Sequence, residues 1–223
     1  MSSFRRLSGA GIVIAADDWT ALGVTLTVVA GVVVVLAVVA PVLVFGILRL
    51  PNRWRALATV LLLFPLMVPP TVAGFYYLQS PLPAFTLPSV IVVVSMMALP
   101  LATLPLLTAA TSVPSDMIEA ARCLGLSPTD VFRRVIVPTC WGGYVTGLAT
   151  AAAHAAGSFG AVLMVGGNLP GRTRTLSIAV YEHGQNLDPS AAHRSAILLL
   201  SVSATSIFLT SWWARSRQPV VRT

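Results

Sequence analysis

The sequence is short of charged residues, and it contains no lysine at all. Only 9% of its 223 residues are charged, against roughly 25% in an ordinary soluble domain. So few charges cannot cover a surface that faces water, and the mean hydropathy of +0.85 points the same way. The composition therefore excludes an ordinary soluble protein and indicates a chain whose main solvent is lipid.

Residue patterns that bind metals or nucleotides are also missing. The two cysteines form neither a CxxC pair nor a Cys/His ligand pattern, and no glycine-rich phosphate loop of the Walker type is present. A polar stretch near the C-terminal end holds acidic and histidine residues, but their spacing matches no metal site. We therefore predict no metal and no cofactor in this chain. The residues considered are Cys123, Cys140, Glu182, His183, Asp188 and His193.

Long apolar runs are abundant. A helix needs about 20 apolar residues to cross a bilayer. Five runs satisfy this requirement: residues 21–48, 56–78, 87–110, 144–166 and 192–213. We therefore predict an all-α polytopic membrane protein with about five transmembrane helices. The segment 167–191 is too polar to span, although its apolar part, 175–181, could form a short helix or a partial sixth span.

The arginines give the predicted orientation. One side of the predicted topology holds nine of them and the other side holds five, and basic residues accumulate in cytoplasmic loops. The first side is therefore predicted to be cytoplasmic, with residues 1–20 outside, one membrane domain over 21–213 and a cytoplasmic tail over 214–223. The nine are Arg49, Arg53, Arg55, Arg122, Arg133, Arg134, Arg215, Arg217 and Arg222; the five are Arg5, Arg6, Arg172, Arg174 and Arg194.

Prolines interrupt the second and third predicted spans. Each one removes a backbone donor, and lipid tolerates such breaks only where protein or a water-filled cavity satisfies the freed groups. Two interpretations stay open: kinked packing, or helices that line a pathway and bend around a gate. The prolines are Pro65, Pro69, Pro70, Pro100 and Pro105.

The long loop at 112–138 has the local chemistry of a helix, a turn and a second helix. Pro114 and Asp116 can start the first helix, with Glu119 placed for a capping box, and Gly125 can end it. Ser127 can cap the second helix, with Pro128 at its first position and Asp130 in its first turn, and Pro138 is expected to stop it. The result is a compact amphipathic bracket. Taken alone, it could also be a helix lying on the membrane surface.

This loop resembles the EAA loop of ABC importer permeases. The matching residues are Glu119, Ala120, Ala121 and Gly125, followed by Ile136, Val137 and Pro138. The resemblance implies a type I importer permease in the bacterial cytoplasmic (inner) membrane, acting as a homodimer. It also implies two ATPase subunits, which bind ATP and Mg²⁺, and an extracytoplasmic binding protein. The residues implied to dock the ATPase are Glu119, Ala120, Ala121, Gly125 and Pro138.

Two further stretches resemble molybdate permeases: residues 66–76, with a Pro-Pro pair, and residues 159–176. The resemblance implies an oxyanion importer for molybdate or tungstate, with a sulfate/thiosulfate permease as the alternative. Positive charge at the outer mouth would attract a dianion. Where that family has an Arg and a Glu one helical turn apart, this chain has His154 and Ser158. Candidate pathway or gate residues are Pro69, Pro70, Ser158, Phe159, Asn168, Arg172 and Arg174.

One alternative belongs to another class, an intramembrane serine hydrolase using Ser158 and His154. The two residues lie one helical turn apart, so their side chains could approach each other. A nucleophile also needs a third group that orients its base, and no acidic residue lies nearby. We therefore expect a transporter subunit and not an enzyme, with ATP hydrolysis carried out by a separate chain.

Overall fold

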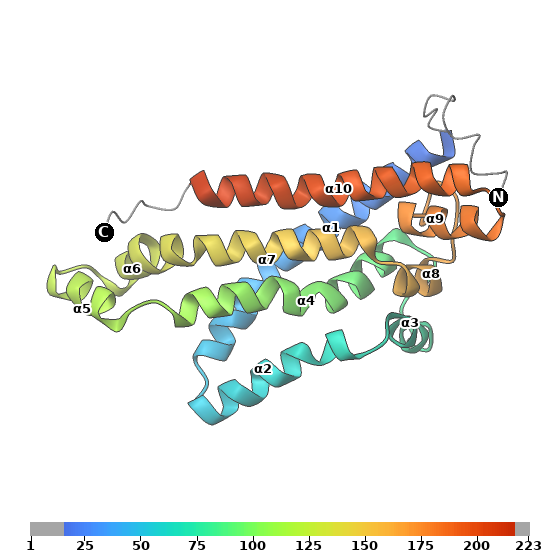
Figure 1. Cartoon of the computed structure of the whole chain (residues 1–223). Coiled ribbons are helices and arrows are strands. Elements are labelled where there is room, and N and C mark those ends of the chain that lie inside the picture. The colour runs from blue at the N-terminus through green and yellow to red at the C-terminus, as the bar shows by residue number, and fades with distance from the viewer. Residues whose placement is uncertain (1–15, 217–223) are drawn as a thin grey trace.

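The protein, seen in a computed structural model, is a bundle of long helices with short helices at both of its ends (Figure 1). The structure describes the backbone over residues 16–216 and the side chains over residues 17–206 and 208. No strand occurs within these bounds. The helices are α1 (Ala16–Leu48), α2 (Asn52–Met67), α3 (Pro70–Leu78), α4 (Leu87–Thr111), α5 (Ser115–Cys123), α6 (Pro128–Val131), the π-helix η2 (Phe132–Ile136), α7 (Val137–Gly157), α8 (Gly160–Gly166), α9 (Leu176–Gln185) and α10 (Pro189–Ser216).

Several of these helices are long and apolar enough to cross a membrane. Among the described residues there are three such segments, Asp17–Leu48, Leu87–Thr111 and Pro128–Gly157, and the bent pair of α2 and α3 would make a fourth. The predicted fifth span, 192–213, lies within α10, a 28-residue helix. The predicted all-α polytopic class is therefore confirmed. Residues 1–15 of the predicted N-terminal segment and 217–223 of the predicted tail lie outside the described residues.

The core lies where α1, α4 and α7 meet. Helix α1 contributes a stripe of buried residues spaced four apart, so that they share one face of the helix. Opposite this stripe stand small and branched side chains of α4 and α7. Small residues at a helix interface let backbones approach closely, which is the main packing device inside a membrane. The core set is Val24, Val28, Val32, Leu36 and Ala40 with Val90, Val94, Ala98, Ala102, Ala151 and Ala155.

A buried carboxylate ties α1 to the C-terminal helices. Asp18 is 1% exposed, and its Oδ1 accepts a hydrogen bond of 2.6 Å from the hydroxyl of Ser195 in α10. His183 of α9 brings its Nε2 to 3.7 Å from the same oxygen. The bond between Asp18 and Ser195 joins residues 177 positions apart, and it holds the start of α1 against α9 and α10.

Two predicted spans are broken in the structure. Residues 56–78 were expected to form one helix, but α2 ends at Met67 and α3 continues at an angle of 91° to it. The consecutive prolines cause this break, because Pro69 cannot donate to the helix and favours an extended residue before it; Val68 has ψ 124°. The predicted span 144–166 also breaks, at Ser158, where the backbone is extended before α8 begins. The short helix α9 agrees with the short helix expected around 175–181.

Candidate functional sites

The first candidate site is the hairpin of α5 and α6, which projects from one end of the bundle (Figure 1). The loop between α1 and α2 lies at the same end, and the short helices α3, α8 and α9 lie at the other. The predicted bracket is therefore a real feature of the fold, although its start differs from the prediction. The N-cap is Pro114, and Asp116 sits inside the first turn, where its Oδ1 accepts a 3.2 Å hydrogen bond from Ser115. A carboxylate placed inside the helix cannot act as its N-cap, so the capping box with Glu119 does not form.

The turn of the hairpin follows the prediction. Gly125 has a φ of +79°, and its N–H donates to the carbonyl of Arg122 at 2.9 Å. The N–H of Leu126 donates to the carbonyl of Ala121 at 3.2 Å, which completes a Schellman motif. Ser127 then caps the second helix, since its hydroxyl accepts the N–H of Asp130 at 3.2 Å. The turn is thus fixed by backbone geometry that favours glycine.

Pro138 does not stop the second helix. The chain runs from Pro128 to Gly157 as one helical segment, with the π-helix Phe132–Ile136 immediately before α7. Pro138 lacks the N–H that would bond to the carbonyl of Arg134, and a wider turn just before it accommodates this loss. The hairpin is therefore continuous with α7, and a movement of α6 can be passed directly to a helix of the core.

The hairpin residues predicted to dock an ATPase differ in exposure. Ala121 is buried, whereas Glu119, Ala120, Gly125 and Pro138 are exposed. Large apolar side chains that the prediction missed also face outward: Leu124 is 80% exposed and Met117 is 46% exposed. Exposed apolar side chains next to an acidic one on a projecting helix give a surface suited to a protein partner. Their signal in the sequence was a large apolar residue in the first turn of α5 and another at its C-cap.

Helix α7 also supplies hydroxyls to carbonyls that prolines leave free. Pro41 cannot bond to the carbonyl of Ala37, and the hydroxyl of Tyr144 donates to that oxygen at 3.0 Å. Pro105 likewise frees the carbonyl of Leu101, which lies 3.0 Å from the Thr150 hydroxyl; the carbonyls of Gly147 and Thr146, at 2.9 Å and 3.1 Å, compete for the same proton. The proline break in α1 is therefore satisfied by a side chain of the helix that carries the hairpin. For Pro105 in α4, the nearby hydroxyl of α7 supports the interpretation of kinked packing.

Replacing Tyr144 by phenylalanine removes only the hydroxyl that reaches Ala37. We expect the free energy of unfolding to fall by about 0.6 to 1.7 kcal/mol, the range for one interhelical hydrogen bond in a membrane protein. Reversible unfolding in mixed detergent micelles measures this change. The matched control is Tyr76→Phe, because the Tyr76 side chain is 67% exposed. Equal stability of the Tyr144 and Tyr76 variants would contradict the role given to this hydroxyl.

The second candidate site is the place where two helix breaks meet. Pro69 and Pro70 start α3, and Ser158 and Phe159 separate α7 from α8. The two breaks are close: a Cβ added to Gly160 would lie 3.1 Å from Thr71 and 3.4 Å from Pro70. The structure thus brings together four of the predicted pathway residues at the end of the bundle opposite the hairpin.

The predicted residues of the next loop form a separate cluster around Glu182. Asn168 has a φ of +53° and donates from Nδ2 to Glu182 Oε2 at 3.1 Å. Arg174 lies 3.2 Å from the same oxygen, and its side chain is only 11% exposed. Arg174 is therefore paired with Glu182, and its predicted place in the pathway stays a prediction. Arg172 is exposed.

Sequence reasoning missed the residue that holds this loop together. Thr173 is fully buried, and its hydroxyl donates to the carbonyl of Gly166 at 2.6 Å while accepting the N–H of Leu169 at 3.1 Å. Thr173 lies between Arg172 and Arg174, within the stretch that resembles the molybdate permeases. Its position in that stretch was the one signal in the sequence that could have marked it.

Neither rival chemistry finds a site in the structure. The Ser158 hydroxyl donates to the backbone carbonyl of His154 at 2.9 Å and not to its imidazole, so the serine is not activated as a nucleophile. Among residues 17–206 no group of three or more His, Cys, Asp and Glu side chains could hold a metal ion. Asp188 instead caps α10: the N–H of Ala191 and the Ser190 hydroxyl donate to its carboxylate and lower its pKa.

Comparison with known proteins decides the family. The sequence profile of the binding-protein-dependent transport system inner membrane components matches residues 8–222. The chain belongs to this family. It is the permease subunit of an ABC importer, a multi-pass membrane protein and not an enzyme.

Individual relatives of this chain are also permease subunits of transport systems. The molybdenum transport system permease protein ModB of Azotobacter vinelandii is 30% identical over 192 residues, which cover 79% of this chain and 85% of ModB. The ModB of Escherichia coli K12 is 29% identical and covers 72% and 78%. The sulfate transport system permease protein CysW of the same strain is 31% identical and covers 76% and 65%. In the inward-facing MetNI methionine ABC transporter, a chain 16% identical has a TM-score of 0.64 over 91% of this chain and 94% of its own length. That likeness confirms the permease fold predicted from the sequence.

Proposed function

We propose that this permease imports an oxyanion, molybdate or its analogue tungstate, as a homodimer whose α5–α6 hairpins dock two cytoplasmic ATPases. The observation that carries the proposal is the hairpin itself. It projects from one end of the bundle, presents Glu119, Met117 and Leu124 outward and continues into α7. A helix seated in a partner's groove can transmit a rigid-body movement, which a loose loop could not.

The arginines of the described side chains support the proposed orientation. The hairpin end holds six, at positions 49, 53, 55, 122, 133 and 134, and the opposite end holds three, at 172, 174 and 194. An excess of basic residues favours the cytoplasmic side. The hairpin end then faces the ATPases, which bind ATP and Mg²⁺, and the end with α3, α8 and α9 faces the binding protein.

The proposed transport cycle uses the two candidate sites in turn. Closure of the ATPase pair on ATP would move both hairpins, and α7 would carry that movement to the break at Ser158 and Phe159. Because this break lies beside Pro69 and Pro70, bending there would open the pathway toward the binding protein. Hydrolysis in the ATPases would reset the hairpins. Exposed Arg172, rather than Arg174, is the cation that would attract the dianion.

Molybdate is favoured over sulfate because the match spans 85% and 78% of the two relatives named molybdenum permeases, against 65% of the sulfate permease CysW. A sulfate or thiosulfate permease is the second candidate, since the relative named for sulfate has a similar identity. Tungstate is included with molybdate because the chemistry of the two oxyanions is alike.

Deleting the gene tests the substrate. We expect the deletion strain to stop growing when molybdate is limiting and to recover at high molybdate, while growth under sulfate limitation stays unchanged. Uptake into proteoliposomes that hold the complete transporter and its binding protein should saturate with molybdate and resist a hundredfold excess of sulfate. Growth loss under sulfate limitation, with effective competition by sulfate, would establish the second candidate instead.

A further inference from the structure

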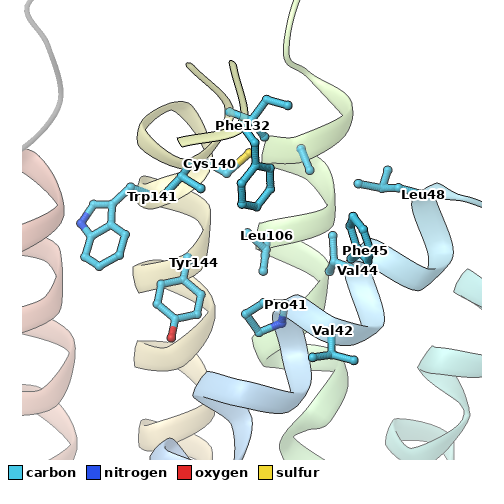
Figure 2. Close-up of a pocket in the computed structure, with 13 residues that line it drawn as sticks. Pro41, Val42, Val44, Phe45, Leu48, Leu106, Phe132, Cys140, Trp141 and Tyr144 are labelled. Atoms are coloured by element: carbon cyan, nitrogen blue, oxygen red, sulfur yellow. The ribbon is translucent and has the colours of Figure 1, made fainter. Parts of the chain in front are cut away.

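An apolar cavity lies between α1, α4 and the joint of η2 and α7. Its volume is about 570 Å³, within the range of about 300 to 1,000 Å³ that is usual for ligand sites. Figure 2 shows Phe132 at the end nearer the hairpin, Pro41 and Val42 at the other end, and Phe45 and Leu48 along one side. The lining is almost wholly hydrocarbon. The hydroxyl of Tyr144, a lining residue, donates its proton to the carbonyl of Ala37.

An arginine lies at the rim of this cavity. The guanidinium of Arg49 lies 4.1 Å from the ring centroid of Phe45, which lines the cavity. Arg133 follows the lining residue Phe132 directly in η2. Neither arginine pairs with a carboxylate among the described residues, and the nearby Asp130 is engaged by Arg134 at 3.3 Å. The cavity is therefore apolar inside and positively charged at its rim.

We propose that this cavity holds an acyl chain of an anionic phospholipid, with the phosphate of its headgroup bound by Arg49. The cavity is built from membrane-crossing helices and is lined by Leu48, the last residue of α1, so its surroundings are the acyl chains and headgroups of a leaflet. Arginine binds phosphate through two parallel N–H donors, and arginines at the membrane surface attract anionic lipids. The Phe45 ring holds the guanidinium in place at the rim.

The lining argues against an extended peptide as the occupant. An inserted extended peptide would bring backbone N–H and C=O groups against an almost wholly hydrocarbon wall, and burying such groups unpaired is costly. A hydrocarbon chain carries no such groups. The lipid chain would also touch Phe132 and Ile136 of the π-helix, so the site lies at the joint between the hairpin and α7.

Photo-crosslinking in nanodiscs tests the site in the complete transporter. The probes are phosphatidylglycerol and phosphatidylcholine that carry the same acyl chain with a diazirine near its end. We expect several-fold more crosslinking of phosphatidylglycerol than of phosphatidylcholine to peptides that contain residues 41–48 and 132–144. Arg49→Gln should abolish this preference, whereas Arg172→Gln, which removes an exposed arginine at the other end, should leave it unchanged.

Filling the cavity separates the acyl chain from general contact with lipid. Ala110 lines the cavity, so Ala110→Phe should remove crosslinks of both lipids at these peptides. Val38→Phe is the control, because Val38 is 66% exposed on α1 and does not line the cavity. Equal crosslinking of the two lipids in the unmodified transporter, or no lipid crosslink at these peptides, would overturn the proposal. The Arg49 variant alters only an exposed side chain, so it decides the matter even if Ala110→Phe fails to fold.

Discussion

Replacing Gly147 by valine is expected to push α7 away from α4 and to destabilise the whole bundle. A Cβ added at Gly147 would overlap the carbonyl group of Ala102, and one added at Gly143 would lie 2.5 Å from the carbonyl oxygen of Pro105. Both obstacles are backbone atoms, which no rotamer change can move. Overpacking usually costs about 1–3 kcal/mol and occasionally more, and we expect the upper end here because two helices must separate.

Reactivity of a buried thiol reports this separation. Cys140 of α7 is buried against Leu106 and Leu107 of α4, whereas Cys123 is exposed. In a Cys123→Ser background, Gly147→Val should make Cys140 react much faster with a maleimide and should lower the melting temperature. The control is Gly23→Ala in α1, where an added Cβ meets nothing within 4 Å and alanine should raise helix stability by up to about 1 kcal/mol. Unchanged thiol protection in Gly147→Val would show that α4 and α7 do not depend on this close approach.

The helices themselves could be predicted from the sequence, but the way in which single prolines are accommodated could not. Pro41 and Pro105 lie within continuous helices, whereas Pro69 and Pro70 separate α2 from α3. Pro69 and Pro70 are consecutive, and this local feature breaks the helix, whereas Pro41 stays inside α1, where a hydroxyl of α7 reaches the carbonyl that it leaves free. Whether such a hydroxyl is present depends on tertiary packing, so periodicity and hydropathy do not say how a single proline inside a helix is accommodated.

The hairpin was predictable because its determinants are local. Gly125 ends α5 and Ser127 caps α6 through bonds that span at most five residues. The pairing of Arg174 with Glu182 connects a loop to the next helix, and the sequence contains no signal for which acidic residue an arginine will meet. The same holds for Asp18 and Ser195, which meet only because α1 and α10 pack together. A free charge at the outer end of a pathway is therefore harder to predict from sequence than a helix cap or a turn.

Replacing Gly125 by valine is expected to uncouple ATP hydrolysis from transport. The φ of +79° places this residue in the left-handed region, where a β-branched side chain costs on the order of 1–3 kcal/mol. The chain can relieve that strain by opening the turn, which would change the angle between α5 and α6. Under the proposed docking, the ATPase would still bind nucleotide, but its movement would no longer reach α7. Uptake should fall more than tenfold while ATPase activity persists.

Gly125→Asn is the matched control, because asparagine tolerates the left-handed conformation and should retain most of the uptake.

A second variant separates the shape of the hairpin from the surface it presents. Glu119→Lys leaves the turn intact but reverses an exposed charge on α5, and it should weaken co-purification of the ATPase; Gln185→Lys, which adds a charge at the opposite end, should not. If Gly125→Val and Glu119→Lys both retain full uptake with an unchanged complex, the hairpin is not the docking element. If only Gly125→Val is impaired, coupling depends on the angle between α5 and α6. The ATPase then binds the exposed apolar residues Met117 and Leu124 rather than the charge of Glu119.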